Sequence, residues 1–193
     1  ETVVKQPQLI HHQHALVYED RSITVHSIPL QHRLPTSGYL FKEKPGLPHI
    51  RREMIDAFNI PISQINNIKA GASWTTEDGT IIPHERLTTP ANPPRSYAYC
   101  SDTVYLPHLK DILNGVTLLY HEATYMHERA PRAEQTRHST ALQAAMQARD
   151  AKVEQLCIGH FSASLKDENS LLREAQSVFP NTTLANEGLV VSI

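Results

Sequence analysis

Cysteine is scarce in this sequence, and long apolar runs are missing. The 193 residues include two cysteines, Cys100 and Cys157, which stand in apolar surroundings and not at the paired spacings of zinc or redox motifs. We therefore expect two small core residues in a reducing cytoplasm rather than a disulfide framework. No apolar run approaches the roughly 18 residues of a membrane span, and no charged-then-apolar signal segment opens the chain, so we expect no membrane partner.

A strong excess of charge of one sign is also absent. The chain has 18 basic and 20 acidic side chains and a formal net charge of -2. This balance excludes a general basic surface for nucleic acid, so a polyanion would have to be bound by a local patch. The length and the 40% hydrophobic content are sufficient for the core of one domain.

A regular α/β pattern is present after residue 94, with one β-rich segment before it. The pattern predicts strands over 16–30, 96–100, 116–120 and 153–159 and helices over 106–113, 141–151 and 169–179. The first strand would end near Gln31 and His32, and Pro35 and Gly38 would then form a turn. Thr140 and Gln143 have the spacing of a capping box at the start of the second helix.

Residues 42–94 have a different, proline-rich composition. A short helix is expected over 50–58, and Glu77-Asp78-Gly79 between two β-rich pairs indicates a hairpin. We predict that this segment is a subdomain inserted into the α/β fold.

Polar side chains follow the predicted strands. They are His32, Asp102, Glu122 and His160. Because the carboxyl ends of strands in strand–helix–strand units share one edge of the sheet, these side chains should meet there. Imidazole and carboxylate together suit Zn²⁺ or Mn²⁺, and a carboxylate can bridge two ions about 3.5–4 Å apart. Each histidine taken alone is more often an ordinary hydrogen-bonded core or surface residue, but coincidence at three or four strand ends is much rarer.

The order of these motifs resembles that of the ribonuclease Z family. The segments concerned are His32-x-x-Pro35-x-x-Gly38-Tyr39, Ser101-Asp102-Thr103, His121-Glu122-Ala123-Thr124, His138-Ser139-Thr140 with Gln143-Ala144-Ala145, and Gly159-His160-Phe161-Ser162. Members are tRNA 3′-processing endoribonucleases of the metallo-β-lactamase superfamily. The resemblance implies an αββα sandwich, zinc as the cofactor, tRNA precursors as the substrate, a homodimer and a cytoplasmic location.

The resemblance also implies a role for each matching residue. His32 and His160 would be ligands of different zinc ions, and Asp102 would bridge the two. His138 would donate a proton to the leaving 3′ oxygen, a step worth roughly 10²–10⁴ in rate. Glu122, the other candidate catalytic residue, would either orient a neighbouring histidine or anchor the strand end, and both roles stay open.

The inserted segment resembles the family's protruding tRNA-binding arm, or exosite. Residues 42–70 carry five basic side chains against three acidic ones. Lys44, Arg51 and Arg52 are therefore candidate substrate-binding residues, since contacts to phosphate are the main source of nucleic-acid affinity. The alternative is a solvated polar arm without a partner.

Two features depart from the family pattern. The His-x-His-x-Asp-His loop, which supplies most metal ligands in the family, is absent, and we interpret His11, His12 and His14 as surface residues. Residues 1–193 therefore resemble the C-terminal half of the enzyme, whose partner would be the missing N-terminal half. Ser164-Leu165 also stands where the family has Arg-Tyr, and serine cannot replace the paired phosphate contacts of a guanidinium.

Two functions remain open on the sequence alone. The first is a zinc-dependent endoribonuclease that removes the 3′ trailer from tRNA precursors, with this chain inactive by itself. The second is a non-catalytic tRNA-binding or structural half of the same fold.

The number of ligands generates a prediction about zinc. Each ion would have at most two ligands from this chain, including the shared Asp102, whereas zinc sites normally use three or four protein ligands. We expect less than one zinc ion per chain after dialysis at micromolar protein concentration, measured by elemental analysis. One or more retained ions per chain would contradict this expectation.

Overall fold

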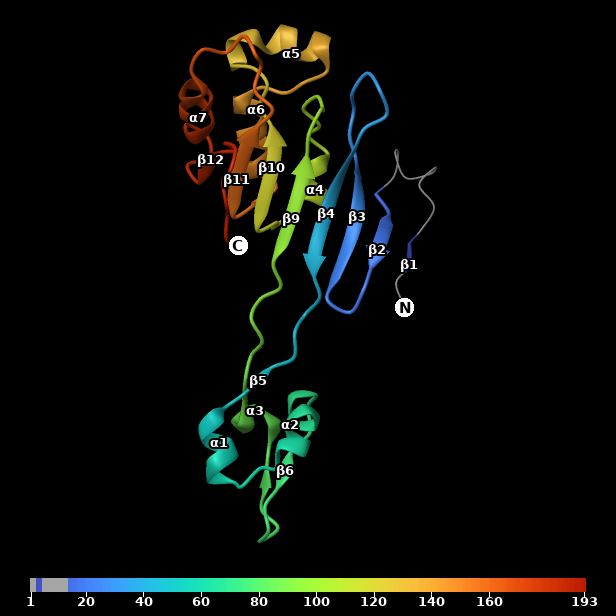
Figure 1. Cartoon of the computed structure of the whole chain (residues 1–193), viewed down its shortest axis with the longest axis vertical. Coiled ribbons are helices and arrows are strands. Elements are labelled where there is room, and N and C mark those ends of the chain that lie inside the picture. The colour runs from blue at the N-terminus through green and yellow to red at the C-terminus, as the bar shows by residue number, and fades with distance from the viewer. Residues whose placement is uncertain (1–2, 5–13) are drawn as a thin grey trace. The chain divides into compact units, whose positions relative to one another are not determined.

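The computed structural model describes residues 3–4 and 14–193, so His11 and His12 lie outside the described residues. The chain divides into two compact units: Glu1–Glu43 with Arg95–Ile193, and Lys44–Pro94. Figure 1 shows both units, which are described separately below.

The first unit is built on one sheet of eight strands in the order β1-β2-β3-β4-β9-β10-β11-β12. The strands are β1 (Val3–Val4), β2 (Leu16–Glu19), β3 (Ile23–Pro29), β4 (Ser37–Glu43), β9 (Ser96–Cys100), β10 (Leu118–Glu122), β11 (Gln155–Gly159) and β12 (Thr182–Leu184). The last four are mutually parallel, and β4 is antiparallel to both β3 and β9. The carboxyl ends of β3, β9, β10 and β11 consequently lie at the same edge of the sheet (Figure 1).

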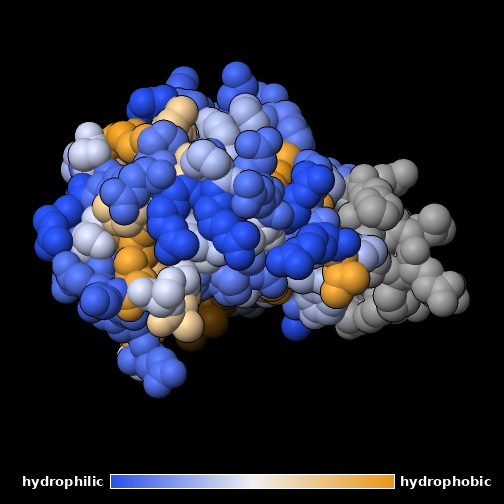
Figure 2. Space-filling view, turned by 90° about the horizontal axis from the view of Figure 1, so that it is seen from above, coloured by the Kyte–Doolittle hydropathy of each residue, from blue (hydrophilic) through white to orange (hydrophobic). Residues whose placement is uncertain are grey.

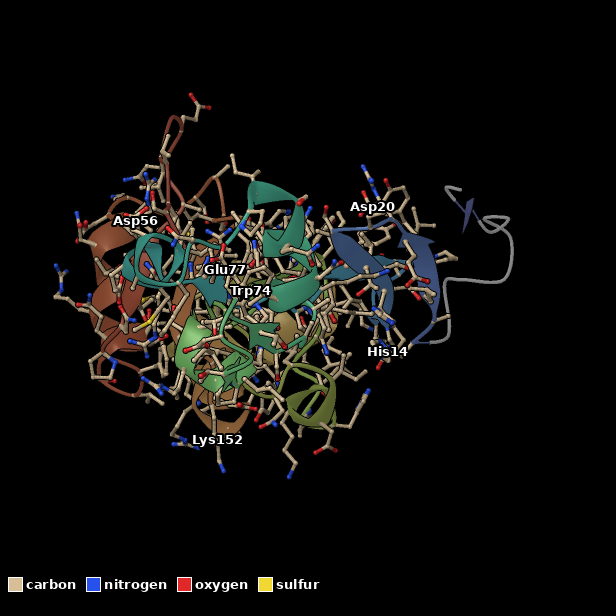
Figure 3. The ribbon with its side chains drawn as sticks, turned by 90° about the horizontal axis from the view of Figure 1, so that it is seen from below. His14, Asp20, Asp56, Trp74, Glu77 and Lys152 are labelled. Carbon is tan, nitrogen blue, oxygen red and sulfur yellow. The ribbon has the colours of Figure 1, made fainter. Side chains whose placement is uncertain are left out.

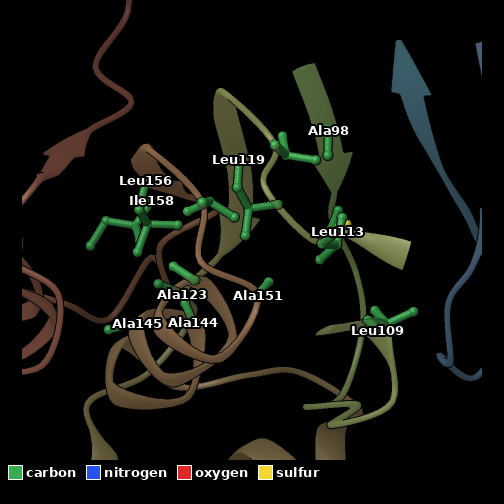
Figure 4. Close-up of a cluster of buried hydrophobic side chains, with 14 of the residues drawn as sticks. Ala98, Leu109, Leu113, Leu119, Ala123, Ala144, Ala145, Ala151, Leu156 and Ile158 are labelled. Atoms are coloured by element: carbon green, nitrogen blue, oxygen red, sulfur yellow. The ribbon is translucent and has the colours of Figure 1, made fainter. Parts of the chain in front are cut away.

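Helices pack on one face of this sheet. They are α4 (Leu109–Ile112), α6 (Ala141–Asp150) and α7 (Glu168–Gln176), whereas α5 (Ala130–Thr136), which follows a short 3-10 turn at His127–Arg129, lies beyond the carboxyl edge of the sheet (Figure 1). Figure 4 shows the core, in which strand residues such as Leu119 and Ile158 face helix residues such as Ala144 and Ala145. Both alanines are fully buried. Their side chains are single methyl groups, so the helix backbone can approach the strands closely. The predicted capping box is confirmed: Gln143 N donates to Thr140 Oγ1 and Thr140 N donates to Gln143 Oε1.

The opposite face of the sheet carries aromatic side chains. The registers Tyr39↔Tyr99↔Tyr120 and Phe41↔Tyr97 place these residues in two adjacent rows across β4, β9 and β10. The rings of Tyr99 and Tyr120 stack with centroids 4.8 Å apart, and burial raises the pKa of Tyr120 to about 12. Tyr39, Phe41 and Tyr99 remain more than one third exposed. One sheet with helices on a single face is half of the expected αββα sandwich.

The second unit is a small α/β module with its own core. It contains α1 (Arg52–Ala57), α2 (Ile62–Lys69), α3 (His84–Leu87) and two strand pairs, β5 (His49–Ile50) with β8 (Thr88–Thr89) and β6 (Trp74–Thr75) with β7 (Ile81–Ile82). The core consists of Ile60, Ile68, Ile82 and Leu87. The hairpin predicted at residues 77–79 is present, and Figure 3 labels Trp74 and Glu77 in it.

An ion pair lies where the first unit gives way to the second. Glu43 N donates to Arg95 O at 2.9 Å, and Arg95 N donates to the Glu43 carboxylate at 2.8 Å. The guanidinium of Arg95 also contacts that carboxylate and lowers the pKa of Glu43 to about 2. The two points at which the chain leaves and re-enters the first unit are thus joined by backbone and side-chain hydrogen bonds.

Several sequence predictions were wrong in their bounds. The single strand expected over 16–30 is a hairpin of β2 and β3, in which Asp20 Oδ1 accepts from Ser22 N and Ile23 N. β10 lies two residues later than expected, α4 is shorter, and α5 and β12 were not predicted at all. None of the helices in the described part of the chain is long and apolar enough to cross a membrane.

The turn predicted after the first strand is present, since residues 30–36, which include Pro35, join the antiparallel strands β3 and β4. The placement of Gly38 in that turn was wrong, because Gly38 is a strand residue of β4. A Cβ at this position would lie 2.4 Å from the carbonyl oxygen of Tyr99. The glycine is therefore required by a close approach of backbone between neighbouring strands and not by a change of chain direction.

Candidate metal centre

The carboxyl edge of the sheet brings the predicted site residues together. Asp102, Glu122, His138 and His160 each offer a ligand atom, and these four atoms lie within 4.8 Å of one another. His32 lies on the loop after β3, and its ring is 4.9 Å from that of His138, which in turn stacks 5.1 Å from that of His160. Figure 2, which looks onto this edge from above, shows a largely hydrophilic surface.

Two of these residues adopt a backbone conformation that side chains disfavour. Asp102 has φ 56° directly after β9, and His160 has φ 60° directly after β11. Arg137, next to His138, has φ 65°. A non-glycine residue in this left-handed region costs roughly 1–2 kcal/mol, and such residues are concentrated at functional sites.

Glu122 is the centre of the hydrogen-bond network beneath the site. Its side chain is fully buried at the end of β10. Oε1 accepts from Thr103 N at 2.6 Å and from His138 Nδ1 at 2.9 Å, and Oε2 accepts from Thr124 Oγ1 at 2.6 Å and from Ser139 N at 3.0 Å. Burial raises the pKa of Glu122, but these hydrogen bonds outweigh it and lower that pKa below its usual value. With four donors around it, the carboxylate has no free position for a metal ion.

The hydrogen bonds fix the tautomer of His160. Thr124 has a single hydroxyl proton, which it donates to the Glu122 carboxylate, its nearest acceptor. At 3.0 Å from His160 Nδ1 the same hydroxyl oxygen then accepts, so in the neutral ring Nδ1 carries the proton and Nε2 the lone pair.

That lone pair faces a second acceptor. His160 Nε2 lies 2.9 Å from Asp102 Oδ1, yet Asp102 Oδ1 is buried without a hydrogen-bond partner among the described residues. Two electron-rich atoms turned toward each other in this way suit a cation that both could ligate. The residues present therefore fit a divalent metal ion.

His32 and His138 differ in the group that each one contacts. His32 Nδ1 donates to the backbone carbonyl of Arg137 at 2.9 Å, which leaves its Nε2 with a lone pair. The hydrogen bond to Glu122 raises the pKa of His138 above its usual value, against the lowering effect of burial. His32 thus has the tautomer of a metal ligand, whereas His138 favours the protonated form.

The structure also adds residues to the site that the sequence did not single out. Thr103 and Ser139 supply backbone donors to Glu122, and Ser139 Oγ donates to Thr103 O at 2.8 Å. His121 does not reach the site, because it is buried and its Nδ1 donates to the carbonyl of Glu122. In the sequence, Thr124 stood out only as part of a motif, whereas in the structure its hydroxyl orients His160.

Three other sequence predictions concern residues outside this cluster. His14, expected at the surface, is exposed and its Nδ1 donates to Ser27 O at 2.8 Å. Ser164 Oγ lies 2.9 Å from Ser162 Oγ, and Leu165 packs against the core. Cys100 and Cys157 are confirmed as buried free cysteines.

The basic residues of the second unit have unequal freedom. Arg52 is exposed, and its guanidinium lies 3.9 Å from Asp56 one helical turn away. Arg51 is half-buried, and its Nε donates to the carbonyl of Thr88 at 3.1 Å. Arg51 therefore supports the fold of this unit, whatever else it contacts.

Curated relatives match nearly the whole chain. No protein-family model matches it. Ribonuclease Z of Phocaeicola vulgatus is 54% identical over 178 residues, which is 92% of this chain and 58% of that protein. Ribonuclease Z of Bacteroides fragilis is 52% identical over 181 residues, which is 94% of this chain and 60% of that protein. The chain is therefore similar, over nearly its whole length, to proteins named ribonuclease Z. It spans about three fifths of the length of these relatives.

Solved structures share the fold. Human tRNase Z, short form, superposes with a TM-score of 0.54 at 19% identity over 92% of this chain and 46% of its own. The metallo-beta-lactamase fold protein YhfI of Bacillus subtilis superposes with a TM-score of 0.53 at 15% identity over 86% of this chain and 48% of its own. The expected metallo-β-lactamase fold is confirmed, with about half of the fold's length in this chain.

The network around Glu122 predicts the effect of a single atom change. Glu122→Gln replaces one acceptor oxygen by an NH2 group. This NH2 group would face the N–H and O–H donors that the oxygen now accepts from, and it cannot accept their hydrogen bonds. We expect a loss of about 1–3 kcal/mol in the free energy of unfolding, since buried groups are left unsatisfied. Urea unfolding at neutral pH measures it. Glu128→Gln is the control: Glu128 is exposed, so its substitution should change stability by less than about 0.5 kcal/mol. Equal stability of the two variants would contradict the role given to Glu122.

Proposed function

We propose that this chain carries part of the active site and the RNA-binding arm of a zinc-dependent endoribonuclease that removes the 3′ trailer from tRNA precursors. The observation that carries the proposal is the pair of acceptors, His160 Nε2 and Asp102 Oδ1, turned toward each other at 2.9 Å. The relatives named ribonuclease Z supply the substrate class. A cytoplasmic location and a homodimer, both implied by the family resemblance, are part of the same proposal.

The metal ligands of this chain are His32, Asp102 and His160 in this proposal. A zinc ion bound there would lower the pKa of a bound water and withdraw electrons from the scissile phosphate. Asp102 would be the ligand shared by the two zinc ions, and the two histidines are held in their ligand tautomers by Arg137 O and Thr124 Oγ1.

His138 is the proton donor to the leaving group. Hydrolysis joins a water oxygen to phosphorus and breaks the bond between phosphorus and the 3′ oxygen, which leaves as a hydroxyl after it takes a proton. Glu122 holds His138 Nδ1 and favours the protonated ring, so Nε2 is the atom that can give the proton up. Glu122 is a positioning residue, since its own side chain is fully buried.

Cleavage is not expected from this chain by itself. Its sequence has no His-x-His-x-Asp-His loop, and Ser164 offers the phosphate no guanidinium. These two observations favour one alternative, a non-catalytic tRNA-binding or structural half of the fold. The two functions differ in whether a protein of the relatives' full length, built with this chain, cuts a tRNA precursor.

The Lys44–Pro94 unit is the tRNA-binding arm in this proposal. Its first part has the local excess of basic residues. Arg52 is exposed on α1, whereas Arg51 is engaged with Thr88 O. The phosphate contacts are therefore assigned to Arg52 first, with Lys44 and Arg51 in supporting places.

Separate roles for His138 and Asp102 can be tested in the full-length protein. His138→Ala should retain zinc while the rate of cleavage of a tRNA precursor falls by about 10²–10⁴. Asp102→Ala should lose both zinc and activity, because the carboxylate is shared between ions. Zinc content, thermal stability and cleavage rate are measured side by side. If the parent is inactive, Ser164-Leu165 is first replaced by Arg-Tyr in both backgrounds.

The cap of α6 makes this test interpretable. It depends on Thr140 and Gln143 and not on His138, so His138→Ala should keep the helix. A loss of zinc in His138→Ala would show that this residue is a ligand and would overturn its assignment as the proton donor.

The arm is tested by binding. We expect Lys44→Ala with Arg52→Ala to weaken tRNA binding and to reduce the slope of log affinity against log salt, since two phosphate contacts are lost. Arg51→Ala is made separately, because it also removes the bond to Thr88 O. Lys110→Ala with Arg149→Ala, two exposed positions on α4 and α6 in the other unit, is the charge-matched control. Unchanged affinity at two salt concentrations would assign the tRNA contacts to another surface.

A further inference from the structure

A hollow of about 560 Å³ opens beside His138 in the first unit. Its volume falls in the range of roughly 300–1,000 Å³ that is usual for small-molecule sites. The lining comes from four places: Gln31 on the loop after β3, the loop after β9, helix α5, and the segment that leads into α6 with Gln143. Asp102 and His160 are not part of the lining, so this space is separate from the pair of metal ligands.

The hollow has one apolar, aromatic wall and one basic wall. Tyr105, Leu106 and Pro131 form the first. Arg137 and His138 form the second, opposed by a single carboxylate, Glu134. Aromatic and apolar surfaces receive the faces of nucleobases, and guanidinium groups bind phosphate.

Arg137 is available for such a contact. Its side chain is exposed, and no described residue gives its guanidinium an ion pair or a hydrogen bond. Its backbone, in contrast, is fixed: φ is 65°, and its carbonyl accepts from His32 Nδ1. Arg137 thus combines a strained backbone conformation with a charged group that has no partner in the described part of the protein.

The chemistry of the proposed reaction says which nucleotide would reach this hollow. The proton from His138 goes to the 3′ oxygen that leaves phosphorus, so the ribose bearing that oxygen must lie against His138. This ribose belongs to the last nucleotide that the tRNA keeps. The first trailer nucleotide is attached on the far side of the scissile phosphate, through its 5′ oxygen.

We propose that this hollow is the subsite for the last retained nucleotide of the RNA, with its base against Tyr105 and its 5′ phosphate on Arg137. The inference rests on the proposed function, since that function places a leaving 3′ oxygen at His138. It gives this chain a phosphate contact at Arg137, although Ser164 stands where the family has an arginine.

Binding of adenosine 5′-monophosphate to the 193-residue chain tests the subsite directly. The compound has the 5′ phosphate and the free 3′ hydroxyl of the retained nucleotide. The chain is dialysed against a chelator first, so that a bound metal cannot hold the phosphate. Backbone NMR signals of Tyr105, Leu106 and Gln143 should shift on titration. Ribose 5-phosphate, which has no base, should bind at least about fivefold more weakly, because stacking on an aromatic ring is lost.

Arg137→Asn removes the guanidinium and keeps the backbone. Asparagine tolerates the left-handed region, and the carbonyl that His32 contacts is unchanged. We expect this variant to bind adenosine 5′-monophosphate about tenfold more weakly, the loss of a charged hydrogen-bond donor. Arg132→Gln is the matched control, since it removes an exposed charge from α5 outside the hollow and should leave the affinity unchanged. Tyr105→Leu should remove the preference over ribose 5-phosphate.

The outcomes separate this inference from the proposed function. Equal affinities of Arg137→Asn and Arg132→Gln, or shifts that avoid the hollow at millimolar nucleotide, would overturn the subsite even if the full-length protein cleaves tRNA precursors. Nucleotide binding in the hollow without any cleavage by the full-length protein would overturn the proposed function and leave a nucleotide site.

Discussion

The buried carboxylate of Glu122 is the interaction on which the candidate site depends. It collects donors from three separate segments: Thr103 after β9, Thr124 after β10, and His138 with Ser139 before α6. A buried charge is costly unless it is fully hydrogen-bonded. The hydrogen bonds that compensate the buried charge of Glu122 form only when all three segments are held at fixed positions. The geometry at the surface is therefore a consequence of a solvation requirement below it.

The two kinds of histidine in the site follow from what stands behind each ring. A neutral acceptor, the carbonyl of Arg137 or the hydroxyl of Thr124, holds one proton on Nδ1 and leaves the outer nitrogen of His32 or His160 as a base. A carboxylate behind His138 instead favours a second proton on the ring. Residues of one type thus acquire different chemistry from partners that lie beneath the surface of the candidate site.

The sequence was sufficient where side-chain pattern decides the structure. The capping box at Thr140, the hairpin at residues 77–79 and the meeting of His32, Asp102 and His160 at one edge all follow from residue type and spacing. The sequence was insufficient where backbone groups decide the structure. The donors Thr103 N and Ser139 N have no signature in residue type. Gly38 of β4 was interpreted as a turn residue because the sequence does not reveal which neighbouring strand approaches it. The engagement of Arg51 with a carbonyl was hidden for the same reason, since any carbonyl is available to any arginine in a sequence.

In terms of chain connectivity, the Lys44–Pro94 unit is the loop of a β-hairpin. β4 and β9 are antiparallel neighbours, Lys42 pairs with Ser96, and Glu43 is bonded to Arg95. Closing a loop costs free energy that grows only with the logarithm of its length, so a unit of about fifty residues instead of a turn of about four changes that cost by only about 2 kcal/mol. The sheet can therefore accept, lose or exchange this unit with little effect on its own folding, and the sequence of the unit is free to change independently of the sheet.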